Sequence, residues 1–221
     1  MQSNRKRWKI GGGVIQMNIA IFGGTGRTGS EMVRRALLDG HEIRALVRTL
    51  KEREQRQGLT WVQGDARNAG AVGAFIAGTD AVVSALGTDA TTTLTEAAAA
   101  IIAGMKAHGV SRIVTIGTAG ILESRTEAGK LRYQSSESHR KSTFAAEEHQ
   151  RAYELLRGSP LEWTVVCPTY LPDGEAVGGY RTERDYLPVG GQQISTGDTA
   201  AFAYAELLKK EHVGYRVGIA Y

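Results

Sequence analysis

Short apolar runs alternate with helical patterns along this chain, at the spacing that is typical of a parallel α/β sheet. The first run, Ile19 to Phe22, leads through a glycine cluster into a helical pattern from about Thr28 to Leu38. Further strands are predicted at 42–47, 59–63, 80–85, 111–116, 161–166 and 215–219, and further helices at 71–77, 92–108, 143–157 and 198–209. This order predicts the α/β class with a doubly wound parallel sheet, in which ligands bind at the carboxyl ends of the strands.

The segments that interrupt the alternation are compatible with one domain. Residues Glu123 to Lys141 are polar and only weakly periodic, which is typical of a loop over an active site. The residues after the sixth strand contribute one helix and one strand, so we expect them to form a small substrate-side subdomain rather than a second core. The sequence therefore predicts a single domain over residues 17–221.

A glycine motif lies where the first strand meets the first helix. It consists of Gly23, Gly24, Thr25, Gly26, Arg27, Thr28 and Gly29. The first glycine permits a sharp turn with positive φ, Gly26 leaves room for a diphosphate, and Gly29 lets the helix pack on the strand. The helix N-terminus then presents free N–H groups to the phosphates. An ordinary glycine-rich turn is the alternative, but the strand before and the helix after favour a Rossmann-type nucleotide site.

The end of the second strand indicates which dinucleotide binds. Sites that prefer NAD carry Asp or Glu there, to hydrogen-bond the ribose hydroxyls. This chain has Arg48 instead, with Arg27 in the glycine motif and Lys51 close behind. A guanidinium can hold a 2′-phosphate through paired, charge-assisted hydrogen bonds. We therefore predict NADP(H) in preference to NAD(H); the alternative is that Arg48 is a solvated strand end.

Two more strand ends are expected to border the adenine half of the cofactor. Asp65 and Ala66 follow the third strand, and Leu86 and Gly87 follow the fourth. Asp65 either faces the adenine ring or caps the helix that begins near Asn68, and the two roles are compatible.

Composition and charge narrow the class of protein. The 221 residues include 27 basic and 23 acidic side chains, a formal charge of +4. Residues 1–16 hold four basic residues and no acidic one, which leaves 23 of each sign in residues 17–221. The domain thus has no basic excess for nucleic acid, and we expect residues 1–16 to be a disordered or non-native head. The single cysteine agrees with a cytoplasmic location, and no apolar run approaches the roughly 18 residues of a membrane span.

Several motifs together resemble the atypical short-chain dehydrogenase/reductases. They are Gly23–Gly29, Leu46–Arg48, Gly64-Asp65, Leu86–Thr88, Met105–Val110, Trp163–Pro168 and Ile194–Ala200. Within that group the chain is most similar to the NmrA-like NAD(P)-binding proteins and to the biliverdin reductase B, or flavin reductase, family. The resemblance implies an NADPH-binding Rossmann domain that passes hydride to a flavin or tetrapyrrole.

The resemblance also implies residues for the nicotinamide and the acceptor. Thr118 follows the fifth strand, where the flavin reductases have serine, and Tyr170 follows the sixth, where they have histidine. Thr118 and Pro168 are expected beside the nicotinamide. Thr118 and Tyr170 are the candidate catalytic residues, each with a hydroxyl near the acceptor. The alternative for Tyr170 is simple packing at the strand end.

The tyrosine–lysine pair of the main short-chain branch is absent. At a spacing of four residues, Tyr133 is followed by Glu137, Tyr153 by Arg157 and Tyr180 by Arg184. Carbonyl reduction by a tyrosine acid is therefore not expected, and Tyr153 with Arg157 is interpreted as a surface pair. Hydride transfer to a flavin requires mainly orientation and a dry pocket.

The remaining polar residues have simpler interpretations. The five histidines show no metal-ligand spacing, so no metal is predicted. His139 in the polar loop is expected to be solvated, with contact to substrate as the alternative. Cys167 is interpreted as a small buried hydrophobic residue, and Glu147-Glu148 as a solvated helix face.

The sequence thus predicts an NADPH-dependent reductase that transfers hydride to a flavin, quinone or similar planar small molecule, as a monomer or weak dimer. The alternative is an NmrA-like redox sensor that binds NADP without turnover. A sugar-nucleotide epimerase or dehydratase is less favoured, because it would need the missing tyrosine–lysine pair.

Overall fold

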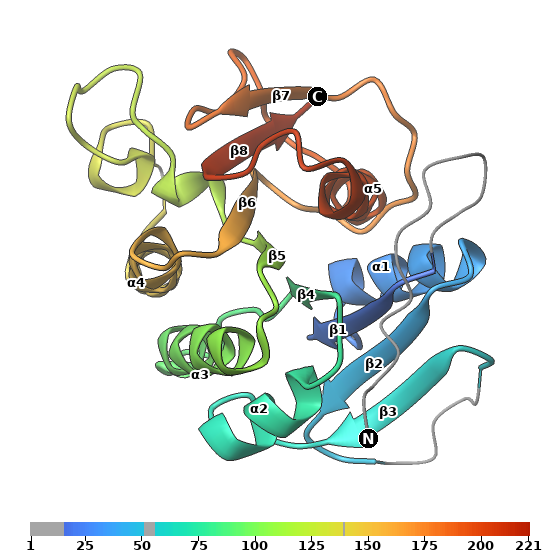
Figure 1. The fold of residues 1–221 in the computed structure, drawn as a ribbon. Helices are drawn as coiled ribbons and strands as arrows, with labels where there is room; N and C mark the ends of the chain where they lie inside the picture. The colour runs from blue at the N-terminus through green and yellow to red at the C-terminus, as the bar shows by residue number, and fades with distance from the viewer. Residues whose placement is uncertain (1–15, 51–55, 139) are drawn as a thin grey trace, which may run out of the picture.

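The computed structural model describes residues 16–50, 56–138 and 140–221, and it places eight strands in one sheet in the order β3-β2-β1-β4-β5-β6-β8-β7 (Figure 1). The strands are β1 (Asn18–Phe22), β2 (Glu42–Val47), β3 (Leu59–Gln63), β4 (Ala81–Ser84), β5 (Arg112–Ile116), β6 (Glu162–Pro168), β7 (Arg181–Arg184) and β8 (Tyr215–Ala220). The helices are α1 (Arg27–Leu38), α2 (Ala69–Ile76), α3 (Thr93–His108), α4 (Phe144–Arg157) and α5 (Thr196–Lys209). The predicted doubly wound α/β fold is confirmed.

Helices cover both faces of the sheet. α1 and α5 pack together on one face, while α2, α3 and α4 form a row on the other (Figure 1). Along β1, Ile19 and Ile21 join the core under α1 and α5, whereas Ala20 and Phe22 join the core under α2 and α3. Successive side chains of a strand point to opposite faces, so a strand covered on both sides must be apolar throughout. This explains the continuous apolar run of β1.

The strand order reverses between β1 and β4, which lie side by side with their carboxyl ends at the same edge. In doubly wound sheets this reversal opens a crevice that the helices do not fill. The candidate site lies here.

The C-terminal region is continuous with the sheet. β8 pairs in parallel with β6, and α5 shares the apolar layer of α1. Within the C-terminal region, the segment directly after β6 is the part that lies on the side where substrate is expected. β7, an antiparallel edge strand, was not predicted, because its Arg-Thr-Glu-Arg sequence has no apolar face and its residues are mostly exposed. Backbone pairing with β8, rather than side-chain burial, makes it a strand.

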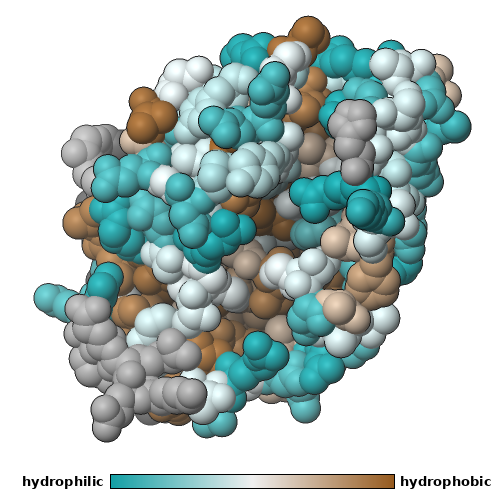
Figure 2. All heavy atoms as spheres, turned by 180° about the vertical axis from the view of Figure 1, so that it is seen from behind, coloured by the Kyte–Doolittle hydropathy of each residue, from teal (hydrophilic) through white to brown (hydrophobic). Residues whose placement is uncertain are grey.

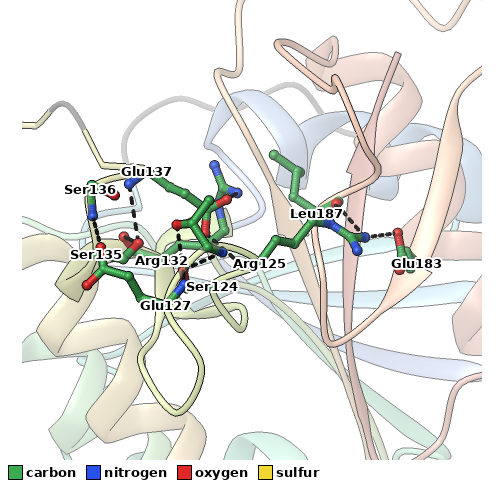
Figure 3. A network of polar contacts seen from close by, with 10 residues as sticks. Ser124, Arg125, Glu127, Arg132, Ser135, Ser136, Glu137, Glu183 and Leu187 are labelled. Carbon is green, nitrogen blue, oxygen red and sulfur yellow. Dashed lines mark hydrogen bonds and ion pairs between the residues drawn. The ribbon is translucent and has the colours of Figure 1, made fainter.

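The polar segment 123–138 is anchored to the far edge of the sheet. It contains one short 3₁₀ turn (Arg132–Gln134) and an antiparallel bridge between Glu123 and Leu131. Arg125 reaches across to the carbonyl oxygen of Leu187 at 3.1 Å and to the carboxylate of Glu183 (Figure 3). These bonds hold the predicted loop in place beside β7.

Most apolar side chains lie in the interior of the protein. In the view of Figure 2, hydrophilic side chains surround smaller hydrophobic areas. Within the described ranges, no helix combines the length and apolarity needed to cross a bilayer.

Candidate functional site

A cleft of about 710 Å³ opens at the carboxyl ends of β1, β4, β5 and β6. Four turns line it, from residues 26–28, 85–88, 116–120 and 168–171, together with residues at and before the start of α4, which are Ser142, Thr143, Ala145, Ala146 and His149. The polar segment adds a further wall through Arg132, Tyr133, Glu137 and Ser138. Of the predicted site residues, the cleft brings together Gly26, Arg27, Thr28, Leu86, Gly87, Thr118, Pro168 and Tyr170.

Two glycines of the motif are required by packing within the protein. Gly23 has φ +75°, and a Cβ there would lie 2.5 Å from the carbonyl oxygen of Ala85. A Cβ on Gly29 would lie 2.2 Å from the carbonyl oxygen of Gly23. The glycine turn, β4 and α1 therefore meet at a distance that only unsubstituted Cα atoms allow.

The other positions of the motif are less crowded. Gly24 is buried, and a Cβ there would lie 3.3 Å from the Cβ of Ala45, while Thr25 is exposed. A Cβ on Gly26 would be 3.3 Å from the Gly23 oxygen, and one on Gly87 would meet no protein atom within 4 Å. Gly87 therefore has open space where a Cβ would lie, whereas a Cβ on Gly26 would be in tight contact with the turn.

The N-terminus of α1 is open toward the cleft. Its N-cap residue is Gly26, which has no side chain to cap the helix, and the first turn carries no acidic residue. The first N–H groups of a helix have no intrahelical partner, and the positive end of the helix dipole adds to their attraction for anions. Arg27 and Thr28, in this turn, line the cleft. This arrangement fits a bound diphosphate.

Arg27 bridges the glycine motif and the segment after β6. Its Nη1 donates to the carbonyl oxygen of Leu171 and to Asp173, each at 3.0 Å. Both side chains of this ion pair are more than half exposed. The guanidinium is thus turned toward the segment after β6, away from the ends of β2 and β3.

Arg48, Asp65 and Ala66 lie at the neighbouring carboxyl ends of β2 and β3, outside the lining of the cleft. The side chain of Arg48 is exposed, and its carbonyl oxygen accepts from Gln63. The guanidinium of Arg67 lies 2.7 Å from the Asp65 carboxylate and, with its backbone N–H, lowers the pKa of Asp65 to about 2. The capping interpretation of Asp65 is wrong, because Asn68 is the N-cap residue of α2 and accepts from the N–H of Ala71.

Thr118 and Tyr170 lie at the end of the cleft formed by the turns after β5 and β6. Thr118 follows β5, and its hydroxyl accepts a long bond of 3.4 Å from the N–H of Gly120. Tyr170 is 63% exposed, so packing at the strand end does not account for it. The backbone of Tyr170 is held by a bond of 2.9 Å from Ile194. Both hydroxyls are therefore placed in one cleft by the ends of adjacent strands.

The structure adds His149 to the site, which the sequence did not predict. This residue lies in the middle of α4, one turn after Ala145 and Ala146, and all three line the cleft. The side chain is partly exposed in the cleft wall, and the loss of solvent lowers the pKa of His149 to about 4. The sequence feature that could have indicated this position was the spacing of Ala145, Ala146 and His149, which puts two small residues and a histidine on one face of the helix.

Two interpretations of α4 from sequence were wrong. Glu148 is fully buried rather than solvated; it accepts from the N–H and hydroxyl of Thr95 and lies 2.6 Å from Arg151. It thereby ties α4 to α3. Tyr153 is not a surface residue: it is half-buried, with the guanidinium of Arg216 4.7 Å from its ring centre.

Cys167 is buried, as predicted. Lys51, His139 and residues 1–15, which entered the sequence predictions, lie outside the described residues.

One group of potential metal ligands lies apart from the cleft. Glu206, Glu211 and His212 have ligand atoms within 4.8 Å of one another. The carboxylate of Glu206 is already bonded to the His212 ring at 2.7 Å and lies 3.9 Å from the buried Arg112 guanidinium. Its negative charge therefore already has a cationic partner within the protein.

Comparisons with known proteins agree with this architecture. The chain is 29% identical over 209 residues to the uncharacterized protein YwnB of Bacillus subtilis, covering 90% of this chain and 96% of that protein. A crystal structure from Bacteroides thetaiotaomicron, provisionally named an epimerase, superimposes with a TM-score of 0.82 at 27% identity, over 94% of this chain and 98% of that one. The protein SP1627 of Streptococcus pneumoniae, provisionally named an NADH-flavin reductase, gives 0.75 at 25% identity, over 92% and 99%.

A family model described as NAD(P)H-binding matches residues 23–210. The match begins at the glycine turn and ends just past α5, so it includes the turns after β1, β4, β5 and β6 that line the cleft. The chain therefore belongs to the NAD(P)H-binding family.

Proposed function

We propose that this protein is an NADPH-dependent oxidoreductase that transfers hydride to a flavin, quinone or similar planar acceptor. The observation that carries the proposal is the single cleft, which joins an open helix N-terminus to an acceptor end with hydroxyl groups. Support comes from the resemblance of the fold to a protein provisionally named an NADH-flavin reductase. The proposal includes a cytoplasmic location and a monomeric or weakly dimeric state.

The glycine turn supplies the binding energy for the diphosphate. We assign this role to the turn formed by Gly23, Gly24, Thr25, Gly26, Thr28 and Gly29, where the N–H groups at the start of α1 face the cleft. Gly26 and Gly87 line the cleft without a side chain, and the open space at Gly87 is what a cofactor lying against the backbone would need. We place Asp65, Ala66, Leu86 and Gly87 along the adenine side.

Arg48 is the proposed ligand of the 2′-phosphate. Its exposed side chain stands at the end of β2, where Asp or Glu would favour NAD. Arg27 was predicted to share this role, but its bonds to Leu171 and Asp173 turn it toward the other side of the cleft. We therefore assign selection of NADPH mainly to Arg48 and regard Arg27 as a cover over the diphosphate.

Thr118 and Pro168 would orient the nicotinamide, and Thr118 and Tyr170 would hold the acceptor. A bound NADPH supplies the hydride, so the residues of the cleft contribute orientation and exclusion of water. The cleft volume of about 710 Å³ lies within the range of about 300–1,000 Å³ that is usual for pockets of small-molecule ligands and cofactors.

Turnover with a panel of acceptors tests this function. The protein is mixed with NADPH and, in turn, FMN, riboflavin and menadione, and the loss of nicotinamide absorbance is followed. We expect turnover with at least one acceptor. Tight NADPH binding without turnover would favour the sensor, and conversion of a nucleotide sugar instead would favour an epimerase.

The Arg48→Glu variant tests cofactor selection. We expect the Kd for NADPH to rise at least about tenfold, because a carboxylate would repel the 2′-phosphate, while the Kd for NADH changes little. Arg44→Gln is the control, because it changes an arginine within β2 whose guanidinium donates to the carbonyl oxygen of Ala77 at the end of α2. Equal losses for both nucleotides in Arg48→Glu would contradict the assignment.

A further inference from the structure

His149 faces two cavities. Together with Ile116 and Gly117, it lines both the main cleft and a smaller cavity of about 30 Å³ beneath the cleft floor. The smaller cavity has hydroxyl-bearing residues in its wall, Ser84, Thr115 and Tyr153. Its volume is sufficient for a water molecule with polar partners. The imidazole thus lies between the acceptor end of the cleft and an interior space whose mostly apolar wall carries the three hydroxyl groups of Ser84, Thr115 and Tyr153.

The imidazole has no structural partner that would explain its position. Within residues 16–50, 56–138 and 140–221, no group hydrogen-bonds the His149 ring. The carboxylate of the adjacent Glu148 acts on the ring only through its charge, which partly opposes the lowering of the pKa of His149, since it is bonded to Thr95 and Arg151. Within the described residues, its ring nitrogens are not among the fully buried polar atoms that lack a partner, so they are accessible to a partner from outside the protein. The cleft is where such a partner would be.

His149 also differs chemically from the other groups in the cleft. The charged residues of the lining are Arg27, Arg132, Glu137 and Arg140, and the phenols are Tyr133 and Tyr170. Tyr133 is already bonded to Gln150 and Gln134. Among the described lining residues His149 carries the only imidazole, and its lowered pKa leaves one ring nitrogen protonated and the other free at neutral pH.

We propose that His149 hydrogen-bonds the acceptor and passes it the proton that accompanies the hydride. The acceptor would then belong to the class that gains a proton on a carbonyl oxygen or ring nitrogen. This inference rests on the proposed function.

The step balances in atoms and charge. A bound NADPH would supply the hydride, which carries two electrons and one hydrogen nucleus, and the electron pair displaced in the acceptor would move to its oxygen or nitrogen. That atom forms a bond to the proton of one His149 nitrogen. The other His149 nitrogen would take a proton from a water molecule in the small cavity, and the hydroxide that remains would be converted back to water by a proton from solvent. The net change is uptake of one proton from solvent for each hydride transferred.

His149→Ala is the informative change, measured with NADPH and menadione. We expect kcat to fall about 100-fold, the effect of losing a positioned proton donor. The Kd for NADPH, measured by nicotinamide fluorescence, is expected to stay within about twofold. Imidazole added to the buffer should restore at least a tenth of the activity, whereas thiazole, which has a similar shape and no N–H group, should not.

Two further variants make the test decisive. His108→Ala removes an exposed imidazole at the end of α3, outside the cleft lining, and should leave kcat unchanged. If His149→Ala does not fold, His149→Gln keeps a polar group of similar size and should show the same loss of kcat, because an amide cannot relay a proton.

These measurements distinguish a failure of the proposed role of His149 from a failure of the proposed function. If the wild-type protein binds NADPH but reduces no acceptor, the proposed function fails, and the role of His149 fails with it. If the wild-type protein is active and His149→Ala retains more than a third of kcat, or is rescued equally by thiazole, the proton role alone is overturned.

Discussion

The variant Gly29→Ala should disable the glycine turn although it adds only one methyl group. The new Cβ would lie 2.2 Å from the carbonyl oxygen of Gly23 and 2.9 Å from its carbonyl carbon. Carbon and oxygen normally approach to about 3.3 Å, so the two groups must separate by about 1 Å. The turn cannot easily retreat, because the Gly23 oxygen also accepts the N–H of Gly26 at 2.9 Å and Gly23 itself abuts Ala85.

Two opposing effects determine the size of the loss. Overpacking of this kind costs about 1–3 kcal/mol, and alanine recovers up to about 1 kcal/mol as a better helix former than glycine. We expect a net loss of about 1–2 kcal/mol in the free energy of unfolding. A shift of about 1 Å would also move the N–H groups of α1 away from the phosphates. We therefore expect the Kd for NADPH to rise at least about tenfold, or 1.4 kcal/mol.

Urea denaturation and fluorescence titration with NADPH measure the two effects. Gly73→Ala in α2 is the matched control, because the atom nearest to its Cβ would be Nε2 of His108, at 3.9 Å. It should raise stability by up to about 1 kcal/mol through helix propensity and leave the Kd unchanged. The packing argument would be refuted if Gly29→Ala were as stable as wild type and bound NADPH equally well.

Three further predictions concern buried groups. Glu148→Ala should lower the free energy of unfolding by about 2 kcal/mol, since it removes the buried acceptor of Thr95, whereas the neighbouring Glu147→Ala should change it by less than about 0.5 kcal/mol in the same urea assay. The pKa of His149 falls from 6.5 to about 4 on folding, so the unfolded chain binds more protons between these values and stability must decrease as pH falls. Between pH 8 and pH 5 His149 should account for about 2 kcal/mol of that decrease, which His149→Gln would abolish. Burial raises the pKa of the Cys167 thiol to about 12, so its reaction with Ellman's reagent should proceed only as fast as the protein unfolds.

Each of the three predictions would be contradicted by a specific result. Equal effects of the two glutamate variants would show that Glu148 is dispensable as a tie between α4 and α3. A pH dependence that is unchanged in His149→Gln would place the titration elsewhere, for example at His41, whose pKa burial also lowers. Labelling of Cys167 under native conditions at the rate of an exposed thiol would show that β6 opens locally.

Local patterns in the sequence were sufficient for the strands and helices that approach the site. The strands at 42–47 and 59–63 have the predicted bounds, and α1, α3 and α4 begin within one residue of theirs. These elements were predictable because strands covered on both faces are apolar throughout, and because glycine and polar residues mark their ends. β7 was missed, since its residues bury no apolar face.

The environment of individual side chains was harder to predict. Glu147 and Glu148 are neighbours with the same charge, yet only Glu148 meets Thr95 of α3 and is buried. His149 lines the cleft because α4 crosses beside β5 and β6. Arg27 turns to Asp173, 146 residues away in the chain. In each case the deciding partner lies on another element, and no local pattern records it.

The sequence by itself determined that a strand, a glycine turn and a helix follow one another, because turn conformation and apolar periodicity depend on neighbouring residues. Only the tertiary structure decided which side chains share the cleft, because burial, pKa and hydrogen bonding depend on contacts between elements that are distant in the chain.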